Sequence, residues 1–286
     1  MDRYKETKIA GILGIIGNIF LLFIKAIIGF TIKSQSLIAD SANSASDIFA
    51  SIMTYIGNKI ASEPKDDSHN YGHGKAEYIF SLFISISMIA VAVRILIGAI
   101  QSLITKDYLE FSWVAIIVCI TTIIIKFLLF LYTNRLVKTF DNLLLKANRD
   151  DHRNDCIVTT CTLLSILVTL IGIKWLDGIV GIGISIWIAY TGFTIFIESY
   201  NVLMDKSLDD ETRILIVKLV KKNHKVNSID SLHTIPVGYQ YIVVLTIGVD
   251  GTISTFDSHE LADKIENEIT STIDKVYDTI VHIEPK

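Results

Sequence analysis

The chain has 286 residues, of which 51% are hydrophobic and 20% charged, and its mean hydropathy is +0.49. Soluble globular domains average about 45–50% apolar and about 25% charged residues, so the composition favours a membrane protein with an ordinary polar part. The formal net charge of −4 gives no reason to expect a nucleic-acid partner. The three cysteines form no CxxC pair and lie in apolar segments, which is typical of buried hydrophobic residues and not of a disulfide framework.

A helix needs about 20 mostly apolar residues to cross a bilayer, and six segments approach this length and composition. They cover about residues 9–32, 36–60, 77–103, 111–136, 148–173 and 177–200. The second and fifth segments contain acidic residues and are weaker candidates by hydropathy alone. The first segment is too long for the core of a signal peptide, so we expect it to remain in the mature protein.

Lysine and arginine are distributed unevenly over the short connections between these segments. They are concentrated in the amino-terminal tail, the 61–76 loop and the 136–153 loop, whereas the opposite side has little beyond Lys33, Lys106 and Lys174. Basic residues mark the cytoplasmic side of a membrane protein. The pattern predicts a multi-pass protein of the cell membrane with both termini in the cytoplasm.

After residue 206 the chain changes from a predicted membrane domain, residues 1–206, to a polar cytoplasmic domain, residues 207–286. Periodicity predicts a helix at 209–223, strands at 229–236 and 239–249 joined by a Val-Gly turn, a helix at about 255–273 and a strand at 278–284. The order αββαβ predicts a small α+β domain of ferredoxin-like or metallochaperone-like type, with helices covering an antiparallel sheet. The fold class is therefore an all-α six-helix transmembrane bundle followed by a cytoplasmic α+β domain.

The second segment has carboxylates where lipid-facing segments have apolar residues. Asn43 and Asp47 are four residues apart and share one helix face, with Asp40 one further turn away on that side. Asp47 lies roughly 17 Å along the helix from its outer end, at 1.5 Å per residue, which is near the middle of the membrane.

The fifth segment repeats this spacing with Asp151 and Asp155, and Thr159 extends the same polar stripe. Hydropathy alone would begin this helix near Cys156 and leave both acids at the cytoplasmic rim. Pairing with the acids of the second segment predicts a deeper position for them. His152 is one position off the acidic face, and we interpret it as a neighbour of the site and not as a ligand.

Three buried carboxylates need compensation. An aspartate at the bilayer centre costs about 2.5–3.5 kcal/mol, so three cost roughly 9 kcal/mol, which is comparable to the stability of a whole domain. A bound cation is the simplest compensation. For each acid alone, a helix cap or a hydrogen bond within the bundle is the alternative, most of all for Asp40 near a helix start. Three carboxylates and one amide carbonyl favour Mn²⁺, Mg²⁺ or Ca²⁺, whereas zinc prefers imidazole and thiolate.

The chain resembles the cation diffusion facilitators over nearly its whole length. The motifs SLIADSANSASD in the second segment, DDSHNYGHGKAE in the next loop, DDHRND in the fifth segment and LMDKSL before the last domain indicate this resemblance. It implies a homodimeric, proton-coupled exporter of divalent cations that uses no organic cofactor and is not an enzyme. The implied transport site consists of Asn43, Asp47, Asp151 and Asp155.

The resemblance also indicates which metal is carried. Zinc-type members usually have a histidine at the position of Asp151, whereas the manganese-transporting branch has an aspartate there. Manganese is therefore the expected substrate, in agreement with the oxygen-rich ligand set. Export of Zn²⁺, Fe²⁺ or Co²⁺ is the alternative within the same family.

Further metal sites are implied outside the membrane. Asp66, His69 and His73 match a second site in the loop after the second segment, for which a solvated polar loop is the alternative. Lys75 and Asp205 match an ion pair at the dimer interface of family members, although the two charges alone would be interpreted as surface residues.

The cytoplasmic domain of related proteins binds regulatory metal at the subunit junction. His233, His259, His282 and Glu284 match the ligands of that site. One further histidine expected in zinc-type members falls at Leu245, which argues against a full two-metal site and leaves a weaker or differently built site as the alternative.

Two other classes of function are consistent with bound metal. A metal sensor or assembly scaffold would bind ions without moving them, and metal binding without flux in vesicles would distinguish it. A membrane metalloenzyme would need a nucleophile or an activated water beside an open coordination position, and the sequence has no HExxH or Ser/His arrangement that supports one.

Overall fold

The computed structural model describes residues 2–31, 35–105, 112–168 and 175–286, without the side chains of residues 29, 35–43, 45, 176 and 177. The chain divides into two units. The first contains the residues up to Ser62 together with Ala76–Tyr200, and the second contains Glu63–Lys75 and Asn201–Lys286. The loop after the second helix therefore belongs with the carboxyl-terminal part of the chain.

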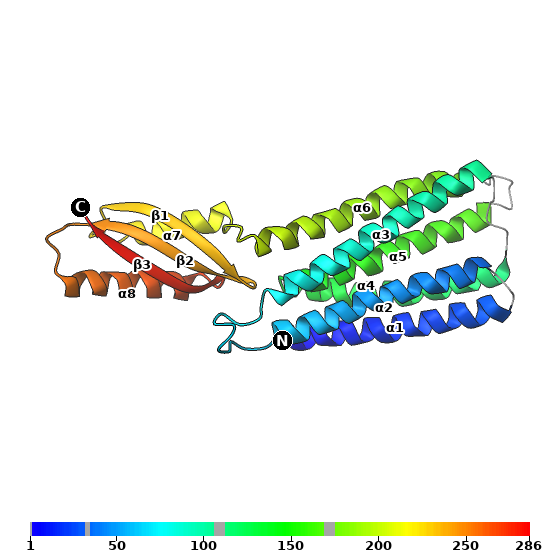
Figure 1. Ribbon diagram of the computed structural model, residues 1–286, viewed down its shortest axis with the longest axis horizontal. Helices are drawn as coiled ribbons and strands as arrows, with labels where there is room; N and C mark the ends of the chain where they lie inside the picture. The colour runs from blue at the N-terminus through cyan, green and yellow to red at the C-terminus, as the bar shows by residue number, and fades with distance from the viewer. Residues whose placement is uncertain (1, 32–34, 106–111, 169–174) are drawn as a thin grey trace. The chain divides into compact units, whose positions relative to one another are not determined.

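Six long helices make up the first unit and lie alongside one another (Figure 1). They are α1 (Arg3–Thr31), α2 (Gln35–Ala61), α3 (Ala76–Thr105), α4 (Trp113–Thr139), α5 (Leu143–Val168) and α6 (Leu176–Leu203). Within the described ranges, α1, α3, α4 and α6 are long and apolar enough to cross a membrane. The predicted helical membrane region is confirmed with these four apolar helices, whereas membrane crossing by α2 and α5 stays a prediction.

Helix α5 begins about one turn earlier than predicted, at Leu143. The Glu77 carboxylate of α3 accepts a hydrogen bond from the Leu143 N–H at 2.7 Å, and Arg3 of α1 donates to the same carboxylate at 2.7 Å. Asn142 caps the helix further, because its Oδ1 accepts from the Leu145 N–H at 2.9 Å. Polar groups from two other helices thus define the start of α5, and the acidic stripe lies about two to three turns inside it.

The second unit has the predicted αββαβ order. It contains α7 (Asp210–Lys221), β1 (Ser228–Val237), β2 (Gln240–Val249), α8 (Thr255–Thr272) and β3 (Val276–Pro285). The strand order is β1-β2-β3, with β1 antiparallel and β3 parallel to β2. The expectation of an antiparallel sheet is therefore wrong for β3. Helix α8 carries the chain back to the other end of the sheet before β3 begins, and such a crossover produces a parallel pair.

Both helices of this unit cover the same face of the sheet. Alternate residues of β2, among them Val243, Leu245 and Ile247, belong to one core cluster with Ile216 of α7 and Ile265 of α8. Successive side chains of a strand point to opposite faces, so this alternation defines the covered face. Leu245 is fully buried in that core, and the position where a ligand histidine was expected therefore serves packing.

The loop Glu63–Lys75 meets the turn between β1 and β2. Gly238 occupies this two-residue turn with φ +85°, a backbone conformation that favours glycine. A Cβ atom on Gly74 would lie 2.9 Å from the Cα of Gly238, so the two backbones approach closely at a pair of glycines. Larger residues at either position would separate the loop from the sheet.

Candidate metal centre

Asp47 of α2 and Asp155 of α5 meet at one buried ammonium group. Lys126 of α4 donates from Nζ to Asp47 Oδ2 at 2.8 Å and also to Asp155 Oδ2. The Lys126 side chain is 1% exposed, and the two carboxylates are largely buried. One nitrogen atom thus bonds carboxylates from two separate helices, so both carboxylates are within reach of a single cation.

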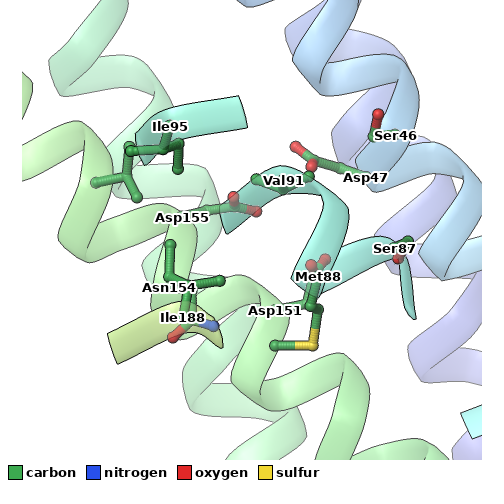
Figure 2. Close-up of a pocket in the computed structure, with 11 residues that line it drawn as sticks. Ser46, Asp47, Ser87, Met88, Val91, Ile95, Asp151, Asn154, Asp155 and Ile188 are labelled. Carbon is green, nitrogen blue, oxygen red and sulfur yellow. The ribbon is translucent and has the colours of Figure 1, made fainter. Parts of the chain in front are cut away.

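The same carboxylates line a cavity of about 30 Å³, which has room for a water molecule or a metal ion. Figure 2 shows Asp47 and Asp155 pointing toward one another beside it. Asp151 and Asn154 of α5 also line the cavity, and α3 and α6 contribute mainly apolar side chains. Of the described residues, those lining the cavity come from α2, α3, α5 and α6, whereas Lys126 reaches the carboxylates from α4.

Several polar atoms around this cavity lack hydrogen-bond partners within the described part of the chain. They include Asp151 Oδ2 and both side-chain polar atoms of Asn154. Buried polar atoms are nearly always paired, so unpaired acceptors that converge on a cavity fit a bound cation or water. The oxygen chemistry suits a hard divalent ion.

His152 lies closer to the acids than the sequence indicated. Asp151, His152 and Asp155 each offer one atom that could bind a metal, and these three atoms lie within 4.8 Å of one another. The imidazole is fully buried, and neither ring nitrogen has a hydrogen-bond partner among the described residues. His152 is not among the residues that line the cavity, and its interpretation as a neighbour and not a ligand stays a prediction.

Hydrogen bonds from two other helices hold α2 in position at the site. Asn18 of α1 donates to the Asp47 carbonyl oxygen at 3.0 Å and to Ser51 Oγ at 3.1 Å. On α5, Asn148 donates to Thr54 Oγ1 at 3.3 Å. These buried contacts fix α2 against α1 and α5, and they lie within about two turns of Asp47.

The predicted transport site is only partly described. Asp47, Asp151 and Asp155 are brought together around the cavity. Asn43 and Asp40 are in helix α2, but their side chains lie outside the described residues. Coordination by Asn43 therefore stays a prediction.

The loop residues Asp66, His69 and His73 form a second cluster, with ligand atoms within 4.8 Å of one another. The backbone N–H of His69, at 2.6 Å from Asp66 Oδ1, is the main reason that the pKa of Asp66 lies below its usual value. His73 Nδ1 lies 3.2 Å from the Pro64 carbonyl oxygen, and its Nε2 lies 3.4 Å from Asp66 Oδ2. A proton on Nδ1 would leave the Nε2 lone pair available for a metal.

Lys75 and Asp205 form an ion pair of 2.8 Å within one chain. Both side chains are partly exposed, so the pair contributes little stability by itself. It joins the 63–75 loop to the segment that follows α6. Its role at a dimer interface stays a prediction.

The four predicted ligands of the cytoplasmic domain do not form one cluster among the described residues of a single chain. His259 is 76% exposed and lies 3.6 Å from Asp263, whereas His282 is 67% exposed and lies 4.0 Å from Glu284. His233 is on β1, where it pairs with Val244 of β2. Across the described residues of this domain, no three histidines, cysteines or acids form a close group. A site at a subunit junction would need a second chain to complete it.

Two known protein domains match this chain in succession. The cation efflux transmembrane domain matches residues 11–204, and the cytoplasmic domain of cation efflux proteins matches residues 208–286. The chain belongs to the cation diffusion facilitator family. Members of this family are transporters and not enzymes, and the cation diffusion facilitator described here is a divalent-cation efflux protein of the membrane.

Several relatives align with this cation diffusion facilitator over nearly its whole length and over nearly all of their own. An uncharacterized transporter of Methanocaldococcus jannaschii is 32% identical and aligns with 98% of this chain and 99% of its own. The manganese efflux system protein MneS of Bacillus subtilis is 28% identical over 100% of this chain and 99% of its own. The cation-efflux pump FieF of Shewanella oneidensis is 24% identical over 98% of this chain and 94% of its own.

Two buried lysines of this cation diffusion facilitator were missing from the predicted site. Lys126 bonds both acids, and Lys25 of α1, which is 4% exposed, also attracts the Asp155 carboxylate. Each lysine interrupts an otherwise apolar segment. Because charged residues inside membrane segments are rare and usually functional, this interruption was the signal that could have identified them.

Proposed function

We propose that the chain exports Mn²⁺ from the cytoplasm in exchange for protons, as a homodimer in the cell membrane. The main support is that the carboxylates of Asp47 and Asp155, on separate helices, lie within reach of one cation beside a cavity that Asp151 also lines. Oxygen donors from two helices can release an ion when those helices move relative to one another. Rocking of helices around a fixed central site is the usual way in which such transporters alternate access.

Manganese is supported by the donor atoms and by one relative. Asp47, Asp151 and Asp155 supply hard carboxylate oxygens, and Asn43 would add an amide oxygen. MneS, a manganese efflux system protein, aligns with the chain from end to end.

Zn²⁺, Fe²⁺ or Co²⁺ is the second candidate substrate, and His152 is the observation that favours it. An imidazole nitrogen of His152 lies within 4.8 Å of carboxylate oxygens of Asp151 and Asp155. Zn²⁺, Fe²⁺ and Co²⁺ accept imidazole as a ligand more readily than Mn²⁺ does. Uptake across a panel of divalent cations would separate the two candidates.

Protons are the proposed counter-ion because the same carboxylate oxygens bind either protons or metal. Metal arriving from the cytoplasm displaces protons, and protons arriving from outside displace the metal. Moving a divalent cation outward costs about 4.6 kcal/mol per 100 mV of inside-negative potential, from about 2.3 kcal/mol per charge, and inward proton flow can supply that free energy.

Two accessory metal sites accompany this proposal. The loop cluster of Asp66, His69 and His73 has three ligand atoms close enough to hold one ion. In the cytoplasmic domain, His233, His259, His282 and Glu284 would bind regulatory metal only when two subunits meet. Metal there would favour one dimer arrangement and so adjust transport.

The decisive experiment replaces the central carboxylates. Asp47→Ala and Asp155→Ala, reconstituted in proteoliposomes, should abolish Mn²⁺-dependent proton flux, because each removes a ligand and leaves the Lys126 ammonium with one partner. Glu198→Ala is the matched control, since Glu198 on α6 pairs with Lys146 and is half-exposed. Full flux in either aspartate variant would refute the site, and metal binding by the wild type without any flux would favour a sensor or scaffold.

A further inference from the structure

The proposed metal ligands are already bridged by a cation that belongs to the chain. Lys126 Nζ bonds Asp47 Oδ2 and Asp155 Oδ2, and all three side chains are largely buried. A divalent ion bound to the same two carboxylates would lie close to the ammonium, and two like charges at short range in a buried site repel strongly. Metal and ammonium therefore compete for the same pair of carboxylates.

Lysine is suited to such competition. Its ammonium is a compact point charge on a flexible four-carbon stem, so the charge can leave the carboxylates without a change in the backbone. Side chains on a helix lean toward its amino terminus, which directs Lys126 toward the preceding turn. Thr122 occupies that turn, and its buried Oγ1 has no hydrogen-bond partner among the residues described. This hydroxyl is an acceptor that a displaced ammonium can reach.

We propose that Lys126 is a resident counter-cation that bridges Asp47 and Asp155 in the metal-free carrier and is displaced toward Thr122 when metal binds. The inference rests on the proposed function of the same carboxylates. It depends on movement of a permanent charge and needs no change in the protonation of the lysine. Lys126 is thus a positioning residue: it weakens metal binding, promotes metal release and holds the two helices together while the site is empty.

The test removes the charge and measures Mn²⁺ binding by calorimetry on the purified full-length protein. Lys126→Met should bind Mn²⁺ about tenfold more tightly or better, because the metal no longer displaces an internal cation. In proteoliposomes the same variant should show a lower KM together with a lower maximal rate, since release becomes harder. Lys126→Arg keeps the charge and should bind Mn²⁺ nearly as the wild type does.

Lys146→Met is the matched control for loss of a lysine ion pair. Lys146 of α5 pairs with Glu198 of α6 outside the cavity, so this variant should keep wild-type affinity and KM. If Lys126→Met binds Mn²⁺ no more tightly than the wild type, or more weakly, the ammonium does not compete with metal and the inference is wrong.

Loss of the ammonium removes the bridge between two buried carboxylates and can lower stability. The proposal then requires Mn²⁺ to raise the melting temperature of Lys126→Met by more than it raises that of the wild type. An equal or smaller shift would overturn it. A different result would refute the proposed function itself, namely that Asp47→Ala keeps both Mn²⁺ binding and Mn²⁺-dependent proton flux. If Asp47→Ala loses both while Lys126→Met matches the wild type, only the present inference is wrong.

Discussion

Asp151 differs from the two carboxylates beside it because Lys126 bonds only Asp47 and Asp155. Its Oδ2 is buried and unpaired within the described structure, although it lines the same cavity. A ligand without a competing partner is the one whose identity should matter most for the choice of metal. The donor atom at position 151 therefore gives a direct test of selectivity.

Asp151→His should shift transport from Mn²⁺ toward Zn²⁺ by about tenfold in the ratio of uptake rates, since it replaces a hard oxygen by an imidazole nitrogen. The measurement is competitive uptake of the two ions into proteoliposomes. Glu198→His introduces a histidine in the same unit away from the cavity and should leave the ratio unchanged. An unchanged ratio in Asp151→His would contradict the assignment of Asp151 as a ligand.

The acids of the site could be predicted from the sequence, but their counter-charges were overlooked. Spacing of four residues identified Asp47 and Asp155 and their helices. The need for a bound cation follows from the sequence only if the three buried acids are considered alone. Lys25 and Lys126 offset part of their negative charge without metal. Which lysine reaches which acid depends on the packing of α1 against α2 and of α4 against α5. Helical spacing within one segment does not show this packing.

At the scale of elements, α2 approaches its neighbours through a glycine. A Cβ atom on Gly57 would lie 2.6 Å from Phe80 Cβ of α3 and 3.1 Å from Leu144 Cδ1 of α5. Phe80 Cβ is fixed to the backbone, so relief of this overlap requires α3 itself to move. In contrast, a Cβ on Gly98 of α3 would have no atom within 4 Å.

These two glycines make a matched pair for a stability measurement. Gly57→Ala should be destabilising by about 1–3 kcal/mol, as overpacked cores are. Gly98→Ala should be neutral or stabilising by up to about 1 kcal/mol, because alanine favours the helix more than glycine does. Thermal unfolding of the purified variants in the same detergent gives the order of melting temperatures. A Gly57→Ala protein as stable as Gly98→Ala would show that the helices are not packed this closely.

Local signals predicted most elements of the second unit, and long-range contacts explain the exceptions. The helix starts follow from side-chain caps, with Asp209 accepting from the Thr212 N–H and Ser254 from the Asp257 N–H. The start of α5 depends on Glu77, which is 66 residues away in the chain from its partner Leu143, and hydropathy cannot register such a contact. The parallel direction of β3 follows from the α8 crossover, which the pattern of β3 alone does not contain.

At the scale of the whole molecule, the number of membrane crossings decides where the 63–75 loop lies. If α2 and α5 cross, this loop and the carboxyl-terminal domain are on the same side of the membrane. If only α1, α3, α4 and α6 cross, the loop is on the opposite side from that domain. Lys75 pairs with Asp205 at 2.8 Å, and Gly74 meets the β1–β2 turn, so both contacts require one side. Six crossings therefore stay the prediction that agrees with these contacts.

Cysteine labelling in intact cells tests this arrangement. Ser68 is exposed on the loop, and its backbone N–H donates a hydrogen bond to Asp66 Oδ1. In a background in which Cys119, Cys156 and Cys161 are replaced by serine, Ser68→Cys should react with a membrane-impermeant maleimide only after the cells are permeabilised. A loop outside the cell would react at once.

Lys106→Cys supplies the reciprocal measurement, because the connection between α3 and α4 changes sides together with the loop. Six crossings with a cytoplasmic amino terminus place position 106 outside, where it should react in intact cells, as the scarcity of basic residues on that side also predicts. Four crossings reverse both results. Labelling of Ser68→Cys in intact cells together with protection of Lys106→Cys would mean that α2 does not cross. Asp47 would then lie on a helix outside the bilayer, and transport through a site at mid-membrane would no longer be tenable.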